Sequence, residues 1–84
     1  MALRLGSDVS TATTEYGTVL LDQRTGEYWE LNPTGTLVVR TLLQGGDEDD
    51  AVEALVAEFD IDRDRATRDV AELTEQLRTS GLAS

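Results

Sequence analysis

The sequence contains no cysteine, no histidine and no lysine. Without cysteine and histidine, the chain excludes disulfides, thiolate nucleophiles, Cys/His zinc sites and imidazole acid–base catalysis. No apolar run approaches the roughly 18 residues of a membrane span. Residues 1–10 also lack the basic-then-apolar order of a secretion signal. We therefore expect a cytoplasmic protein.

Positive charge is scarce, and all of it comes from arginine. Asp and Glu together number 17 against 7 Lys and Arg, which gives a formal net charge of -10. A field of this sign repels polyanions, because phosphate backbones and anionic lipids bind through clustered cations. The composition predicts no nucleic-acid partner and no membrane partner, and it favours a partner that is neutral or cationic.

The length of 84 residues allows one small domain, and we treat residues 1–84 as that domain. Such a chain buries about 60 to 65% of its unfolded surface, so we expect no deep catalytic cavity. Carboxylates are the only candidate catalytic pair. An acid–base pair needs two carboxyl groups in different environments, one of them desolvated enough to keep its proton. Most of the carboxylates here lie at predicted helix starts or on polar helix faces, where they are solvated. The sequence predicts a protein that is not an enzyme.

The acidic run from Asp60 to Asp64 has some features of a calcium loop. It lacks the glycine at the sixth position and the glutamate at the twelfth, where Ala71 stands. A helix-capping turn explains the run better. We predict no metal and no cofactor.

Short strands are predicted in the first third of the chain. Residues 2–5 alternate between apolar and polar and predict a first strand, while residues 7–15 have too few apolar side chains to pack and predict a flexible loop. Residues 17–23 and 27–31 are β-prone runs joined by Arg24-Thr25-Gly26. This pattern predicts a β-hairpin in which the glycine adopts a positive φ.

Three helices are predicted after the hairpin. The first runs from Pro33 to about Gln44, with Asn32 as its N-cap. The second follows the acidic segment beginning at Asp47, which supplies its cap and three further negative charges, and the third is capped by Asp62 or its neighbours. The third helix carries one apolar stripe of Ala66, Val70, Leu73 and Leu77. Together these elements predict an α+β fold, with strands first and helices after them.

The second arm of the hairpin, Glu27–Leu31, is the most suggestive surface. Alternation places Tyr28 and Glu30 on one face and Trp29 and Leu31 on the other. If this arm is a sheet edge, its backbone donors and acceptors are unpaired and can accept another strand. A proline at Trp29 should then remove an edge donor. A purely structural role of the aromatic side chains, in covering the small core, stays an alternative.

Winged-helix DNA-binding domains also combine a hairpin with helices. In the predicted third helix, however, the arginines alternate with acids, and pairs at a spacing of three or four stabilise helices. The residues concerned are Asp62, Arg63, Asp64, Arg65, Arg68, Asp69, Glu72, Glu75 and Arg78. DNA binding and a generic subunit-docking module remain the alternatives to peptide binding.

A set of short segments resembles the PqqD family. These segments are Leu20-Leu21-Asp22, Thr25 to Asn32, Thr34-Gly35, Leu42 to Gly45, Ala51 to Leu55, and Asp69-Val70 with Leu73 and Leu77. The pattern extends over nearly the whole chain from Tyr16. It consists of many weakly restricted positions and has no single invariant motif.

The resemblance implies a winged-helix-like fold, with a three-stranded antiparallel sheet followed by a three-helix bundle. It also implies a noncatalytic adaptor that binds the leader segment of a ribosomal precursor peptide by β-strand addition. The free-standing size of the chain is similar to that of the recognition protein in split lasso-peptide pathways. Implied partners are the precursor leader, a leader-cleaving cysteine protease and an ATP-dependent cyclase.

In this family the leader adds a strand beside the third strand and lies against the third helix. By resemblance, the strand is Glu27 to Leu31 and the helix is Arg63 to Thr79. The implied peptide-binding residues are Glu27, Tyr28, Trp29, Glu30 and Leu31 of the strand, and Asp69, Val70, Glu72, Leu73, Gln76 and Leu77 of the helix.

Overall fold

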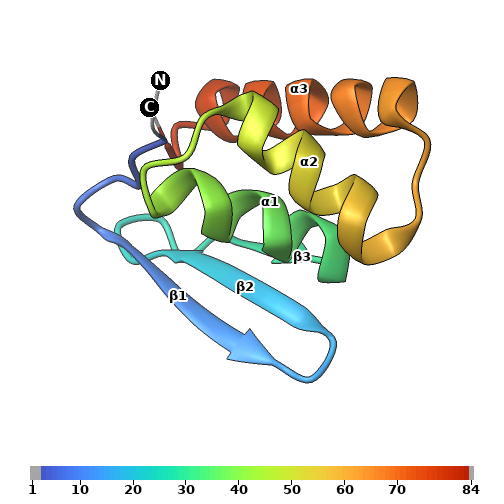
Figure 1. The fold of residues 1–84 in the computed structure, drawn as a ribbon. Coiled ribbons are helices and arrows are strands. Elements are labelled where there is room, and N and C mark those ends of the chain that lie inside the picture. The colour runs from blue at the N-terminus through green and yellow to red at the C-terminus, as the bar shows by residue number, and fades with distance from the viewer. Residues whose placement is uncertain (1–2, 84) are drawn as a thin grey trace.

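The computed structural model describes residues 3–83, which form a three-stranded antiparallel sheet with three helices to one side of it (Figure 1). The sheet order is β1-β2-β3, so β2 is central and β1 and β3 are edges. The predicted winged-helix-like α+β architecture is confirmed. The elements are β1 Val9–Thr14, β2 Gly17–Asp22, β3 Tyr28–Leu31, α1 Pro33–Leu43, α2 Glu48–Phe59 and α3 Arg63–Thr79.

The prediction for the first strand was wrong. Strand β1 occupies residues 9–14, inside the segment predicted to be a flexible loop. Of the predicted strand at residues 2–5, Ala2 lies outside the described residues and Leu5 makes only an isolated bridge with Ala83. Valine and threonine favour strands, and β1 is held by pairing with β2 over its whole length. Low apolar content was therefore a poor guide, because backbone pairing stabilises this strand more than burial does.

Both connections in the sheet are short. Thr14 pairs with Gly17 across a turn of two residues, Glu15 and Tyr16. Gly17 has φ +145, and a Cβ atom at this position would lie 1.8 Å from the carbonyl oxygen of Leu31. The sheet can thus close between β2 and the end of β3 only with glycine at position 17. The predicted β2–β3 hairpin is confirmed, and Gly26 in its turn has φ +78.

The helix starts follow the sequence with one exception. The side chain of Asn32 accepts a hydrogen bond from the Gly35 N–H at 2.8 Å and caps α1. Asp47 and Asp50 form a reciprocal capping box at the start of α2. Asp62 stands before α3, but its side chain makes no capping bond, and only its carbonyl accepts from Ala66. Asp62 is therefore the N-cap residue, as one of the predicted positions, but the expected side-chain cap is absent there.

The core lies between the sheet and the helices. Its largest fully buried side chains are Leu20, Leu42, Leu55, Val70 and Leu77, which come from β2 and from all three helices. Two terminal segments add to it: Leu3 and Leu82 are buried, and the Gly6 N–H donates to the Leu82 carbonyl at 2.9 Å. The segments at residues 3–6 and 82–83 consequently lie side by side at one side of the domain (Figure 1).

We expect Gly17→Ala to lower the free energy of unfolding by about 3 kcal/mol, because the new methyl group would collide with the backbone of Leu31 and strain a positive φ. Gly26→Ala is the matched control. It also has a positive φ, but no atom lies within 4 Å of its added Cβ, so it should cost about 1 kcal/mol. Urea denaturation measures both. Equal losses would show that the close contact between β2 and β3 is not a constraint.

Candidate functional site

Among the described residues, strand β3 has a paired neighbour only on its β2 side. It pairs with β2 from Tyr28 to Leu31, opposite Leu21 to Thr18. In the part of the chain that the structure describes, no segment pairs with the other side of β3. This edge is open.

The hydrogen bonds around the β2–β3 turn determine which backbone groups face the open side. The Asp22 N–H donates to the Glu27 carbonyl at 2.9 Å. In an antiparallel pair, the N–H and C=O of every second residue point to the same neighbour. Trp29 and Leu31 therefore also face β2, and Tyr28 and Glu30 direct their N–H and C=O groups to the open edge.

A second bond, on the opposite side of β2, gives the same assignment. The Gln23 N–H donates to the Asp8 carbonyl at 2.9 Å, so the odd-numbered residues of β2 face β1 and the even-numbered residues face β3. Leu20 is the partner of Trp29 in the register, as this rule requires. A proline at Trp29 would therefore break the β2–β3 ladder rather than remove an edge donor, which corrects the expectation drawn from the sequence.

Helix α3 leaves space beside this edge. No Cα atom of β3 lies within 8 Å of a Cα atom of α3, so α3 does not occupy the position of a paired strand, which lies about 4.8 Å from its neighbour. Two adjoining hollows of about 450 and 370 Å³ occupy the gap, and both are lined by Glu72 and Gln76. We call this continuous depression the β3–α3 groove.

The lining of the groove combines an apolar floor with polar walls. The first hollow is lined by Trp29, Glu72, Glu75, Gln76, Thr79 and Ser80. The second is lined by Glu30, Leu31, Asn32, Thr34, Gly35, Val38, Leu55, Asp69, Glu72, Leu73 and Gln76. An added Cβ at Gly35 would lie 3.2 Å from Asn32 Oδ1 and 3.6 Å from the Leu73 side chain, so the groove floor is closely packed at that point.

The structure brings most of the expected site residues together. Seven of them line the groove: Trp29, Glu30, Leu31, Asp69, Glu72, Leu73 and Gln76. Val70 and Leu77 do not, because their side chains are 1% and 0% exposed and belong to the core. Within the 3.6-residue helical period, these two positions point to the sheet and the other helices, while the groove lies along the neighbouring face.

Glu27 and Tyr28 also lie away from the groove lining. The Glu27 carbonyl is bonded to Asp22, and Glu27 precedes the strand. Tyr28 lies opposite Leu21, so its side chain projects from the face of the sheet that the helices leave uncovered. Tyr28 can therefore contribute to the edge through its backbone, while its ring lies on the other face.

Several groove residues were missed from the sequence. Glu75, Thr79 and Ser80 extend the groove along α3, and a continuation of the three-and-four spacing from Glu72 would have found the first two. Asn32, Thr34, Gly35, Val38 and Leu55 reach the groove through the turn of the chain after β3 and the packing of α1 and α2. No local pattern signals those positions.

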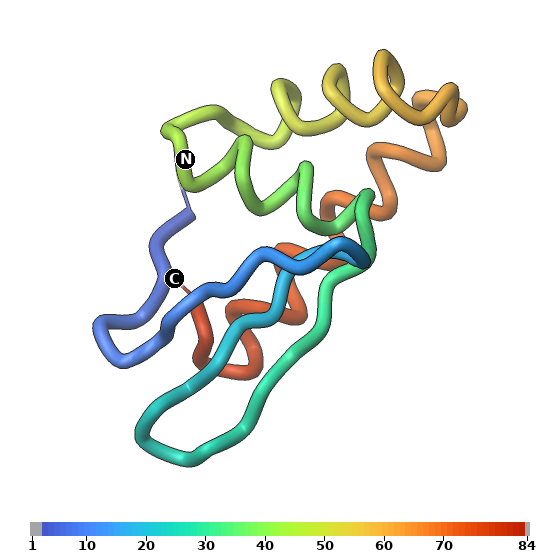
Figure 2. Tube along the Cα trace, turned by 90° about the horizontal axis from the view of Figure 1, so that it is seen from below, coloured from blue at the N-terminus to red at the C-terminus, as the bar shows by residue number. Residues whose placement is uncertain are grey.

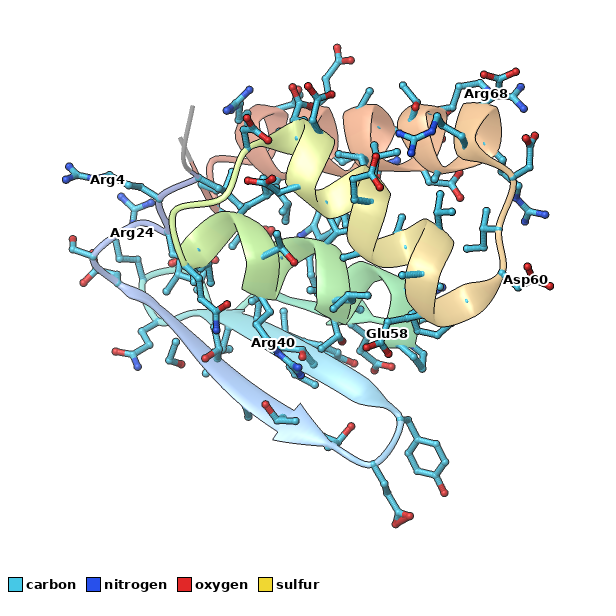
Figure 3. All side chains as sticks on the ribbon, viewed as in Figure 1. Arg4, Arg24, Arg40, Glu58, Asp60 and Arg68 are labelled. Atoms are coloured by element: carbon cyan, nitrogen blue, oxygen red, sulfur yellow. The ribbon has the colours of Figure 1, made fainter. Side chains whose placement is uncertain are left out.

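The groove is acidic. Asp69, Glu72 and Glu75 line it from α3, and among the described residues no arginine lines it; Glu30 borders it from β3, with its side chain directed to the outer face of the sheet. Arg65 approaches Asp69 at 3.9 Å, and Arg63 pairs with Glu53 of α2. Arg40 projects from α1 toward the β1–β2 hairpin (Figure 3). The groove therefore suits a neutral or cationic ligand, and α3 does not present a cationic stripe to DNA.

Within residues 3–83, no three His, Cys, Asp or Glu side chains are grouped so that they could hold a metal ion. No helix in that range is both long enough and apolar enough to cross a bilayer.

Comparisons with known proteins agree with this geometry. Residues 17–83 match the family model described as "Coenzyme PQQ synthesis protein D (PqqD)". A solved structure described as "Lasso peptide synthetase B1 complexed with the leader peptide" shares 43% sequence identity with this chain and has a TM-score of 0.92. The match covers 100% of this chain and 99% of the chain in that structure. Another solved structure, "TbiB1 in Complex with the TbiA(beta) Leader Peptide", shares 27% sequence identity and has a TM-score of 0.85, and the match covers 96% of this chain and 94% of that one. A comparison with curated proteins gave no match.

Proposed function

Since the chain belongs to the PqqD family, we propose that it is a noncatalytic adaptor that binds the leader segment of a ribosomally made precursor peptide. The leader adds to the sheet as a fourth strand along β3. The outward-facing backbone of Tyr28 and Glu30, beside the β3–α3 groove, is the observation that carries this proposal. Both similar solved structures are described as complexes with a leader peptide.

Backbone pairing and side-chain selection are divided between two parts of the site. The N–H and C=O groups of Tyr28 and Glu30 supply the ladder, which any peptide can use. Trp29 lies opposite the fully buried Leu20 and therefore faces the helices. A leader residue opposite Trp29 shares that face and enters the groove. The groove thus selects alternate leader side chains.

The energies are adequate for a specific complex. Each new backbone hydrogen bond contributes about 0.5 to 1.5 kcal/mol. Two or three leader side chains buried against the apolar floor contribute about 1.5 to 3 kcal/mol each. Ordering a flexible leader costs about 2 to 5 kcal/mol. We expect dissociation constants between nanomolar and micromolar, about 12 to 8 kcal/mol, which requires the favourable end of these ranges.

The lining predicts the composition of the bound segment. Leu31, Val38 and Leu73 favour apolar leader side chains in the middle of the groove. Glu72 and Glu75, on the wall formed by α3, favour lysine or arginine at the positions beside them. A leader with acidic residues at these positions would bind less well.

The bound leader is then delivered to processing enzymes. We assign the protein to lasso-peptide biosynthesis, because the structure with 43% identity over the full chain is described as a lasso peptide synthetase B1. Its partners would be a leader-cleaving cysteine protease and an ATP-dependent cyclase. The groove is open to solvent and holds exposed carboxylates, which suits holding a substrate rather than transforming it.

We expect Glu30→Pro to weaken leader binding at least about tenfold, because it removes an N–H that faces the open edge and no bond to β2. Thr11→Pro is the matched control: by the same alternation its N–H faces outward from β1, the other sheet edge. Calorimetry with a synthetic peptide of the cognate leader measures both. Equal losses in the two variants, with circular dichroism unchanged, would refute strand addition at β3.

We expect Leu73→Asp to abolish measurable leader binding, because it places a charge on the apolar floor of the groove. Leu73 is partly buried, so thermal denaturation must show that the variant is folded. Leu43→Asp is the control, since Leu43 is 40% exposed and lies outside the groove. A folded Leu73→Asp variant that binds the leader with wild-type affinity would place the site elsewhere.

A further inference from the structure

The face of the sheet turned away from the helices carries uncovered apolar side chains. Leu21 is 37% exposed and Tyr28 is 63% exposed. They are direct partners in the β2–β3 register, at a position without mutual backbone bonds, where paired side chains approach most closely. Val19 lies on the same face, two residues along β2. We call Val19, Leu21 and Tyr28 the outer patch.

The pattern of β2 suggests that this face becomes covered. Val19, Leu20 and Leu21 are consecutive apolar residues, so β2 is apolar on both faces. Continuous apolar runs are typical of strands buried on both sides, whereas a half-exposed strand alternates. The helices cover only the Leu20 face (Figure 1). Figure 2 looks at the sheet from its other side, and there the strands lie in front of α3.

The outer patch is continuous with the proposed leader site. A leader strand on β3 places the residues opposite Tyr28 and Glu30 on the outer face, because directly opposed residues share a face. These leader side chains cannot enter the groove. They extend the outer patch by one strand, so the complex presents a wider surface than the free protein does.

We propose that the outer patch, completed by the outward side chains of the bound leader, is the docking surface for the protease that cuts the leader from the precursor. This inference rests on the proposed function and names the surface used by its partner. A second copy of the chain is a poorer occupant, because each copy carries a net charge of -10 and the copies repel one another. A protease bound here would contact protein and leader together, and would therefore prefer the loaded complex.

Two affinities are measured for each variant. Fluorescence anisotropy gives its affinity for a labelled cognate leader peptide, and interferometry gives its affinity for the immobilised cognate protease, with and without leader. The variant is Leu21→Glu, which alters the outer patch without touching the edge or the groove. Leu43→Glu is the matched control, because Leu43 is an equally exposed leucine on α1, at 40% against 37%. Thermal denaturation confirms that both variants fold.

For the wild type, we expect leader to raise protease affinity at least about tenfold. Leu21→Glu should lower the affinity of the leader-bound protein for the protease at least about tenfold, which is the loss typical of a residue at the centre of an interface. It should change the affinity for the leader less than about twofold. Leu43→Glu should change neither. Unchanged protease binding by Leu21→Glu, or an equal loss in Leu43→Glu, would overturn the docking surface. Failure of the wild type to bind leader would instead overturn the proposed function.

Discussion

The proposed leader site depends on one constraint, which is that among residues 3–83 only β2 pairs with β3. An unpaired strand edge is a liability that folded proteins usually protect with charges, bulges or a covering element. In this domain α3 could cover the edge, yet it stays more than 8 Å away between Cα atoms. The edge and the groove beside it therefore exist together, and each would be of little use without the other.

The rest of the fold holds that gap open. Gly17 lets β2 pass close to the end of β3, which fixes the strand against the sheet. Asn32 caps α1 directly after β3, so the chain turns into the core immediately and leaves the edge exposed. Val70 and Leu77 anchor α3 to the core by one face, so that the adjacent face with Glu72 and Gln76 becomes a groove wall. One face of α3 thus packs in the core, and the adjacent face of the same helix lines the ligand site.

The sequence predicted the elements better than their boundaries. The hairpin, the three helices and the caps at Asn32 and Asp47 follow from local chemistry, and local chemistry determines them in the structure. Strand β1 was missed because its stability comes from pairing with β2, a contact that composition does not reveal. The family resemblance placed Val70 and Leu77 in the groove, but both side chains are buried in the core, and an apolar stripe on a helix does not by itself show which neighbour it contacts. The direction of each backbone group in β3 required the register itself.

Amide hydrogen exchange of Tyr28 and Glu30 tests the central claim most directly, measured by NMR with and without a saturating cognate leader peptide. In the free protein these two amides should exchange rapidly while those of Trp29 and Leu31 are protected by the ladder to β2. Leader binding should slow the exchange of Tyr28 and Glu30 at least about tenfold and bring them close to their neighbours. A leader that binds and leaves both amides exchanging at the free rate would contradict the account.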